Sequence, residues 1–252
     1  MRQVYGENMF AWGKSDIGRA RRDNQDSFAY SVSETKKLAF AVVCDGMGGA
    51  AAGNVASGLA LEAFTNCIRE AEYRNFTYDQ LRALLEKALE EANGVVREKS
   101  LSSRTYAGMG TTLVSVVATP SKVAVINVGD SRAYKINSEG ITRITNDHSL
   151  VADMVRFGEI TEEQAQEHPG KNLITRAVGT DAAVSGDIFF PKMKQGEFML
   201  LCSDGLSNLV SEQEMLYEVI YGGEHEDCCT RLIDIANGRG GYDNITVVLL
   251  AF

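Results

Sequence analysis

The sequence lacks the features that mark several specialised classes of protein. Its five cysteines are odd in number and form no Cys-x-x-Cys pair, which favours buried free thiols in a reducing cytosol over disulfides. No apolar run reaches about 18 residues, so we expect no membrane span. Residues 1–15 have no basic region followed by an apolar core, so we expect no signal peptide. These absences together predict a cytoplasmic protein.

Positive charge is also scarce. The chain has 25 Lys and Arg against 34 Asp and Glu, for a net charge of −9, which argues against nucleic acid as the main ligand. The same excess opposes phosphate binding unless cations first neutralise the site. The 252 residues are 44% hydrophobic, enough for a sizeable core. Because no linker, repeat or low-complexity tract interrupts them, we interpret residues 1–252 as a single domain.

The most informative stretch runs from residue 38 to residue 64. Residues 38–43 are apolar and β-branched, which predicts a buried strand that ends at Asp45. Gly46, Gly48, Gly49 and Gly53 then allow a tight turn, and apolar residues at helical spacing predict a helix over residues 50–64. A carboxylate beside an uncovered carbonyl suits a hard divalent cation, which takes oxygen ligands.

Other interpretations of this stretch are weaker. Asp-Gly is a common turn dipeptide and on its own is more often structural than functional. A phosphate loop would need Gly-Lys-Ser/Thr, which is missing, and a dinucleotide-binding turn would need Gly-x-Gly-x-x-Gly, which the spacing does not match. The cation interpretation gains weight because the same construction recurs.

Three further aspartates stand at ends of apolar strands. Asp130 follows residues 123–128, Asp204 follows residues 198–203, and Asp243 precedes residues 245–252. Converging carboxylates would repel one another without cations. With no zinc-type Cys or His pattern, oxygen ligands favour Mg²⁺ or Mn²⁺. Two such ions lower the pKa of a bridging water for attack on phosphorus, and an arginine of the 21–26 loop would bind the phosphate.

Between these motifs the pattern predicts helices over residues 78–99, 212–221 and 228–236 and a hairpin of strands 113–118 and 123–128. Residues 146–169 differ, being polar and carrying His148 and His168. Ser149 or Asp147 and then Thr161 are candidate helix caps. Each histidine is more often a hydrogen-bonded residue than a ligand, and the pair forms no zinc pattern.

Taken together, these motifs resemble the metal-dependent protein serine/threonine phosphatases of type 2C, in particular their compact bacterial members. Six segments occur in family order and span almost the whole chain: residues 21–26, 43–49, 108–112, 128–132, 202–205 and 243–246. The resemblance implies an α+β fold, a central antiparallel β-sandwich of two sheets flanked by α-helices on both sides. It also implies a flap insertion at about residues 146–176 that influences substrate choice.

The resemblance further implies a role for each site residue. Asp45 would bridge two core ions, with the Gly46 carbonyl on the second and Asp204 and Asp243 on the first. Asp130, together with Asp204, would hold a third, weaker ion. Arg21 would bind the phosphate, with Arg22 as the adjacent alternative, and Asp26 would orient water. The ions would be Mn²⁺ or Mg²⁺.

Two positions depart from many eukaryotic members. Gln25 stands where they have glutamate, and Met47 stands where they have a histidine proposed as general acid. Methionine donates no proton, so the identity of the acid stays open. The main expectation is a monomeric signalling enzyme that dephosphorylates targets of a serine/threonine kinase and possibly the kinase itself. The alternatives are a hydrolase of small phosphorylated metabolites and a catalytically silent domain that binds phosphoproteins.

Overall fold

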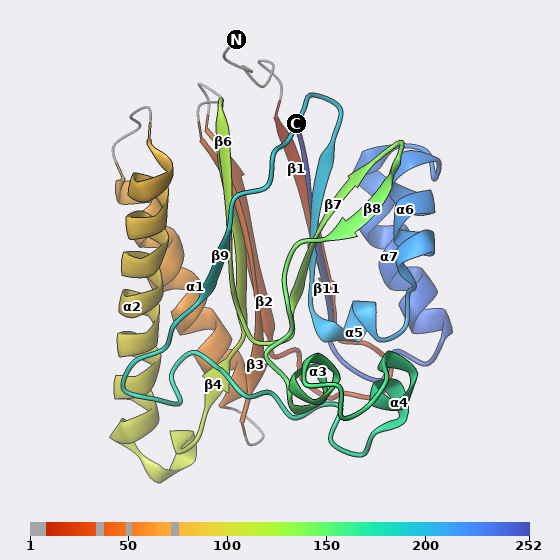
Figure 1. The fold of residues 1–252 in the computed structure, drawn as a ribbon. Coiled ribbons are helices and arrows are strands. Elements are labelled where there is room, and N and C mark those ends of the chain that lie inside the picture. Colours follow the sequence, from red (N-terminus) through yellow and green to blue (C-terminus); the bar gives the residue numbers. More distant parts are fainter. Residues whose placement is uncertain (1–8, 34–37, 49–51, 72–75) are drawn as a thin grey trace.

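The structure is a computed structural model that describes residues 9–33, 38–48, 52–71 and 76–252. Residues 49–51, which belong to the predicted glycine turn and helix start, lie outside the described residues. Two antiparallel sheets pack face to face, and helices cover the outer face of each sheet (Figure 1). The predicted α+β sandwich is therefore confirmed.

The first sheet has the strand order β1-β11-β10-β7-β8. Its strands are β1 (Phe10–Asp16), β11 (Ile245–Ala251), β10 (Phe198–Cys202), β7 (Arg132–Asn137) and β8 (Gly140–Arg143). The second sheet has the order β2-β3-β5-β6-β9, with β4 paired to β3. Its strands are β2 (Asp26–Val32), β3 (Ala39–Met47), β4 (Gly110–Thr111), β5 (Leu113–Thr119), β6 (Lys122–Val128) and β9 (Asp187–Phe189).

Helices close both outer faces and one end of the sandwich (Figure 1). The long pair α1 (Gly53–Glu70) and α2 (Tyr78–Ser102), followed by the 3₁₀ turn η1 (Arg104–Tyr106), covers the second sheet. The helices α5 (Asp204–Ser207), α6 (Glu212–Ile220) and α7 (His225–Gly238) cover the first sheet. The short helices α3 (Leu150–Arg156) and α4 (Glu162–Glu167) lie across the end of the sandwich.

Alternating burial explains this layering. In β3, Phe40 and Val42 pack toward α1 and α2, whereas Ala41 and Val43 pack between the sheets. A strand that is apolar on both faces needs cover on both faces, which is why its sequence reads as a continuous apolar run. Three apolar clusters result: one between the sheets and one beneath each helical layer. No helix among the described residues is long and apolar enough to cross a bilayer.

Several local predictions are confirmed. β5 and β6 form the predicted hairpin. Thr161 caps α4 through a capping box and Ser149 caps α3, as predicted, and Thr77 caps α2 in the same way as Thr161 caps α4. Side-chain oxygens at these positions accept the first free helical N–H groups.

Other local predictions need correction. β3 does not end at Asp45 but continues to Met47, because Gly46 and Met47 pair with Thr111 and Gly110 of β4. β1 has no counterpart among the strands predicted from the sequence. A Cβ on Gly13 would lie 2.8 Å from the rings of both Phe28 and Tyr30, so glycine makes room for them within the strand.

Candidate active site

Asp45 lies near the end of β3, where hydrogen bonds fix the main chain around it. Its N–H donates to Thr112 Oγ1 at 2.9 Å, and its carbonyl accepts from Thr112 N and from Thr111 Oγ1, each at 2.9 Å. Across the sheet its partner is Asp26 of β2. Two carboxylates are therefore held in register at the same end of the sandwich.

Glycines near Asp45 permit a close approach between β3 and α1. A Cβ on Gly46 would lie 2.0 Å from the Gly53 carbonyl oxygen, and a Cβ on Gly53 would lie 2.5 Å from Gln25 Oε1. These positions exclude any side chain. Gly46 is thus required here for packing, because it lies within β3 and not in a turn.

Asp204 and Asp243 reach the same end from the first sheet. Asp204 opens α5 directly after β10, and Asp243 lies before β11, which is the neighbour of β10. A Cβ on Gly205 would lie 2.1 Å from the Asn244 carbonyl oxygen, so the two segments touch. The antiparallel pairing of β10 and β11 brings the end of one strand beside the start of the other.

Asn244 organises the loop that carries Arg21, and sequence reasoning assigned it no role. Its side-chain amide donates to the carbonyls of Ile17 and Asp23 at 2.9 and 3.0 Å. Its Oδ1 accepts from Gln25 N at 2.9 Å. Its position next to Asp243 was the only signal in the sequence, because its partners lie more than 200 positions away.

Arg21 reaches this cluster from the 21–26 loop. Its Nη2 donates to Asp243 Oδ2 at 2.7 Å while half of its side chain stays exposed. Asp243 raises the pKa of Arg21, and Asp45 and Asp204 add to the effect. This geometry favours Arg21 over Arg22 as the phosphate ligand, which remains a prediction.

The carboxylates are poorly compensated within the protein. Asp26 Oδ2 accepts from Ser203 Oγ at 2.8 Å and Thr246 Oγ1 at 2.7 Å, but its Oδ1 is buried with no partner among the described residues. Burial raises the pKa of Asp26 to about 7; the hydrogen bonds from Thr246 and Ser203 oppose this rise, and the charges of Asp204 and Asp243 add to it. Burial and the neighbouring aspartates likewise raise the pKa values of Asp45 and Asp204.

The donor set fits a hard divalent cation, although the side chains as they lie do not surround one. Among the described residues, no three acidic, His or Cys side chains are grouped closely enough to hold an ion. Asp243 points to Arg21, and Asp204 Oδ2 accepts from Asn208 Nδ2 at 3.1 Å. However, Asp204 Oδ1 is buried and unpartnered within the described chain. Orphaned oxygens and raised pKa values are what a missing positive charge produces.

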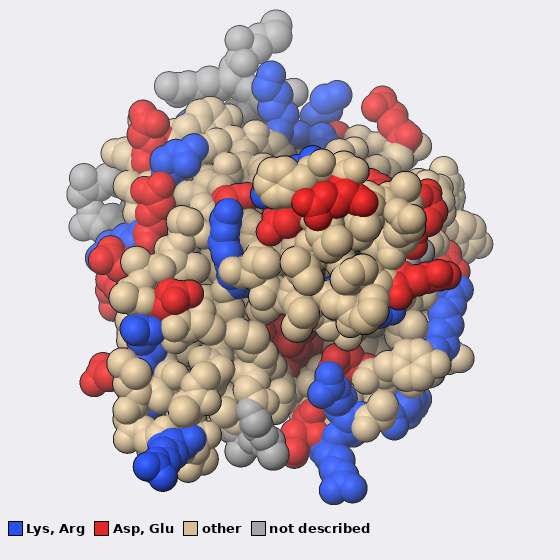
Figure 2. Space-filling model, turned by 60° about the horizontal axis from the view of Figure 1, so that its bottom comes forward, with Lys and Arg blue, Asp and Glu red and all other residues tan. Residues whose placement is uncertain are grey.

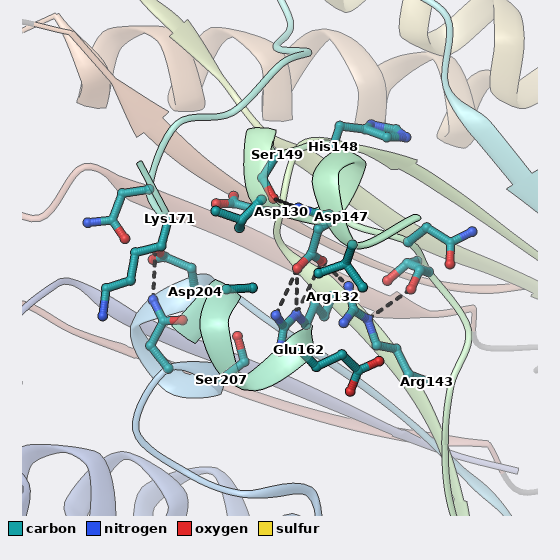
Figure 3. Close-up of a pocket in the computed structure, with 18 of the residues that line it drawn as sticks. Asp130, Arg132, Arg143, Asp147, His148, Ser149, Glu162, Lys171, Asp204 and Ser207 are labelled. Carbon is teal, nitrogen blue, oxygen red and sulfur yellow. Dashed lines mark hydrogen bonds and ion pairs between the residues drawn. The ribbon is translucent and has the colours of Figure 1, made fainter. Parts of the chain in front are cut away.

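Asp130 lies beside a cavity of about 1130 Å³ that it shares with Asp204 (Figure 3). Residues of α3, α4, β7 and the segment after α5 form the other walls. Burial raises the pKa of Asp130 to about 7, Asp204 adds to this, and Arg132 opposes it. Figure 2 shows acidic side chains in and around the hollow of this face. The four predicted aspartates therefore gather at one end of the sandwich.

The other predicted positions can also be located. Met47 is half-buried in β3 opposite Gly110 and offers no proton. Both flap histidines are hydrogen-bonded, as expected: His148 Nδ1 accepts from Gly129 N at 3.1 Å, and His168 Nδ1 accepts from Gly170 N at 3.0 Å.

The chain is similar in sequence to known protein phosphatases. A profile of the family described as protein phosphatase 2C matches residues 13–244. The serine/threonine phosphatase stp of Listeria innocua is 38% identical over 243 residues, which are 96% of this chain and 95% of that protein.

Solved structures agree in fold. Serine/threonine phosphatase Stp1 from Staphylococcus aureus has a TM-score of 0.90 and 35% identity, covering 99% of this chain and 97% of that one. The catalytic domain of the phosphatase PstP, solved with two manganese ions, has a TM-score of 0.84 and 32% identity, covering 96% of this chain and 97% of that one.

Proposed function

The chain belongs to the protein phosphatase 2C family and is a serine/threonine phosphatase, and we propose that its activity depends on two divalent cations, Mn²⁺ or Mg²⁺. Its substrates are phosphoproteins. The proposed ligands are Asp45, the Gly46 carbonyl, Asp204 and Asp243, with Asp130 and Asp204 holding a third ion. When bound, such ions neutralise the carboxylates and supply an activated water for attack on phosphorus.

The chain's own residues have distinct tasks in this proposal. Arg21 binds two phosphate oxygens through its guanidinium, which is already oriented by Asp243 Oδ2 at 2.7 Å. Asp26 accepts a hydrogen bond from the attacking water through its unpartnered Oδ1, while Ser203 and Thr246 hold its other oxygen. Met47 leaves the protonation of the departing serine or threonine oxygen to another group.

One observation carries the proposal: the buried oxygens Asp26 Oδ1 and Asp204 Oδ1 have no partner among the described residues. Burying a carboxylate oxygen without a partner destabilises the folded state by roughly several kcal/mol, unless a cation or a proton compensates the charge. The PstP structure with two manganese ions supports cations as the compensation.

The deciding experiment is phosphate release from a phosphothreonine peptide, titrated with Mn²⁺ and then with Mg²⁺, with a chelator as control. We expect turnover that needs metal and disappears on chelation. Release only from small phosphorylated metabolites would favour the metabolite hydrolase. Metal binding without any release would favour the silent phosphoprotein-binding domain.

We further propose that residues 1–252 form one catalytic domain, with residues 146–176 as its flap, and that the enzyme is a cytoplasmic monomer. The apolar cluster shared by both sheets supports a single folding unit. Its substrates would be targets of a serine/threonine kinase and possibly the kinase itself. Sedimentation of the purified protein tests the monomer, and a single cooperative unfolding transition tests the single domain.

A further inference from the structure

The turn that carries Asp130 is held from one side by His148. His148 Nδ1 accepts from Gly129 N at 3.1 Å, and the Gly129 carbonyl accepts from His148 N at 2.9 Å. Gly129 has a φ of +102°, and a Cβ there would lie 2.6 Å from the Thr112 side chain. The residue before Asp130 is thus fixed by two reciprocal bonds in a backbone conformation that favours glycine.

Asp147 holds the other side of the same turn. Arg132, two positions after Asp130, donates from Nη2 to Asp147 Oδ2 at 2.7 Å and from Nε to the same carboxylate (Figure 3). Arg143 also donates to Asp147. Asp147 is only 10% exposed, so this ion pair is shielded from solvent. Adjacent residues 147 and 148 therefore hold the two flanks of Asp130.

His148 also lies where the two legs of the flap meet. Its carbonyl accepts from Thr175 N at 2.8 Å. Its Nε2 lies 3.2 Å from Asp187 Oδ2, and Asp187 Oδ1 pairs with Arg176 at 3.0 Å. Because Nδ1 accepts the Gly129 N–H, the ring proton is on Nε2 and points to Asp187. The imidazole thus links the exit leg of the flap to the Asp130 turn.

We propose that Asp147 and His148 are positioning residues that fix Asp130 for its cation and couple that site to the flap. The inference rests on the proposed third ion site. A movement of the flap base shifts residues 147 and 148, and with them both flanks of Asp130.

The test is calorimetric titration with Mn²⁺ of His148→Leu, compared with the wild type and with Asp130→Asn. We expect the Kd of the weakest Mn²⁺ binding event to rise by about tenfold in His148→Leu, which is the usual effect of removing an outer partner of a metal site. The Kd values of the tighter events should stay unchanged. His168→Leu is the matched control, because His168 makes the same kind of bond within the flap to Gly170. His148→Asn should restore binding, since its amide oxygen replaces Nδ1 as acceptor.

The outcomes distinguish an error in the proposed third ion site from an error in the positioning role of His148. If Asp130→Asn binds Mn²⁺ as the wild type does, the third site itself is wrong. If Asp130→Asn loses the weak event but folded His148→Leu keeps it, the positioning role is wrong. Should His148→Leu not fold, ¹⁵N NMR of the wild type with Mg²⁺ decides. The His148 Nδ1 resonance should move during the weakest binding phase and not in Asp130→Asn, and a resonance that stays fixed overturns the inference.

Discussion

The two ends of strand β10 place buried carboxylates in opposite surroundings. Before the strand, Glu197 accepts from Lys135 Nζ at 2.8 Å, from Asn137 Nδ2 at 3.0 Å and from Lys194 N at 2.7 Å. Burial alone would raise its pKa, but these partners lower it. After the strand, Asp204 keeps an unpartnered buried oxygen within the described chain, and burial with the Asp243 charge raises its pKa.

The difference lies in compensation, because both carboxylates are largely removed from solvent. The protein supplies Glu197 with its own cation, so the folded state favours the charged form of that carboxylate. At the other end, the charges of Asp26 and Asp204 add to the burial that raises the pKa of Asp45, and for Asp204 the cations Arg132 and Arg21 offset only part of the rise. Carboxylates that the fold buries without compensating them support the proposed cation site at this end.

Removing a site carboxylate should have the largest effect on activity and little effect on folding. Asp204→Asn should lower metal-dependent phosphate release by at least about a hundredfold, because a cation site contributes several kcal/mol to the transition state. With a chelator present, its melting temperature should match or exceed that of the wild type, since repulsion with Asp45 and Asp243 is relieved. Near-normal turnover in the purified variant would refute the role of Asp204.

A variant at the other end of β10 should lose stability and keep its activity. Glu197→Gln leaves Lys135 without its buried partner and should reduce the free energy of unfolding by about 3 kcal/mol. Turnover per folded molecule should not change, because Glu197 lies at the far end of β10. Urea unfolding and phosphate release on the same sample check both statements. A loss of kcat with unchanged stability would contradict the comparison.

The pH dependence of the metal-free protein should show the strain at the site. The pKa of Asp26 is about 7 in the folded state against an ordinary 3.8, so the folded protein binds a proton that the unfolded chain has released. Its stabilising contribution is present below about pH 4 and is lost as pH rises to about 7. With chelator, the free energy of unfolding should therefore fall by roughly a few kcal/mol across this window.

Asp26→Asn is the control for that titration. It should make the decline between about pH 4 and pH 7 shallower, because one of the carboxylates with a raised pKa is gone while Asp130, Asp45 and Asp204 remain. Added Mn²⁺ should flatten the wild-type curve as well, since a bound cation favours the charged carboxylates. Identical slopes for variant and wild type would mean that Asp26 does not titrate in this window.

Substituting the exposed arginines Arg21 and Arg22 should change activity the least, and the comparison should show which of them binds the phosphate. Arg21→Ala should raise KM for a phosphothreonine peptide by about tenfold, the loss of one charge-assisted contact, with kcat less affected. Arg22→Ala, its neighbour in the same loop, should stay within about twofold of the wild type. The reverse ranking in steady-state kinetics would assign the phosphate to Arg22.

Some of this site could be read directly from the chain. Asp45, Asp130, Asp204 and Asp243 were identifiable because each adjoins an apolar strand and a small residue. The motif segments 108–112 and 243–246 contain Thr112 and Asn244, but sequence reasoning could not assign their roles. Their partners lie far away: Asn244 bonds to Asp23 and Ile17, and Thr112 bonds to Asp45. Short strands such as β8 and β9 were also missed, since pairing rather than pattern defines them.

By itself, then, the sequence determined the strands and helices with strong periodicity, the positions of the carboxylates and, through motif order, the family. Those features depend on local spacing, which the chain carries wherever it folds. The tertiary structure alone decided which carboxylates meet and which are compensated. Strand pairing and sheet packing bring together residues that are distant in the sequence. They pair Glu197 with Lys135, whereas they place Asp204 near the like charge of Asp243.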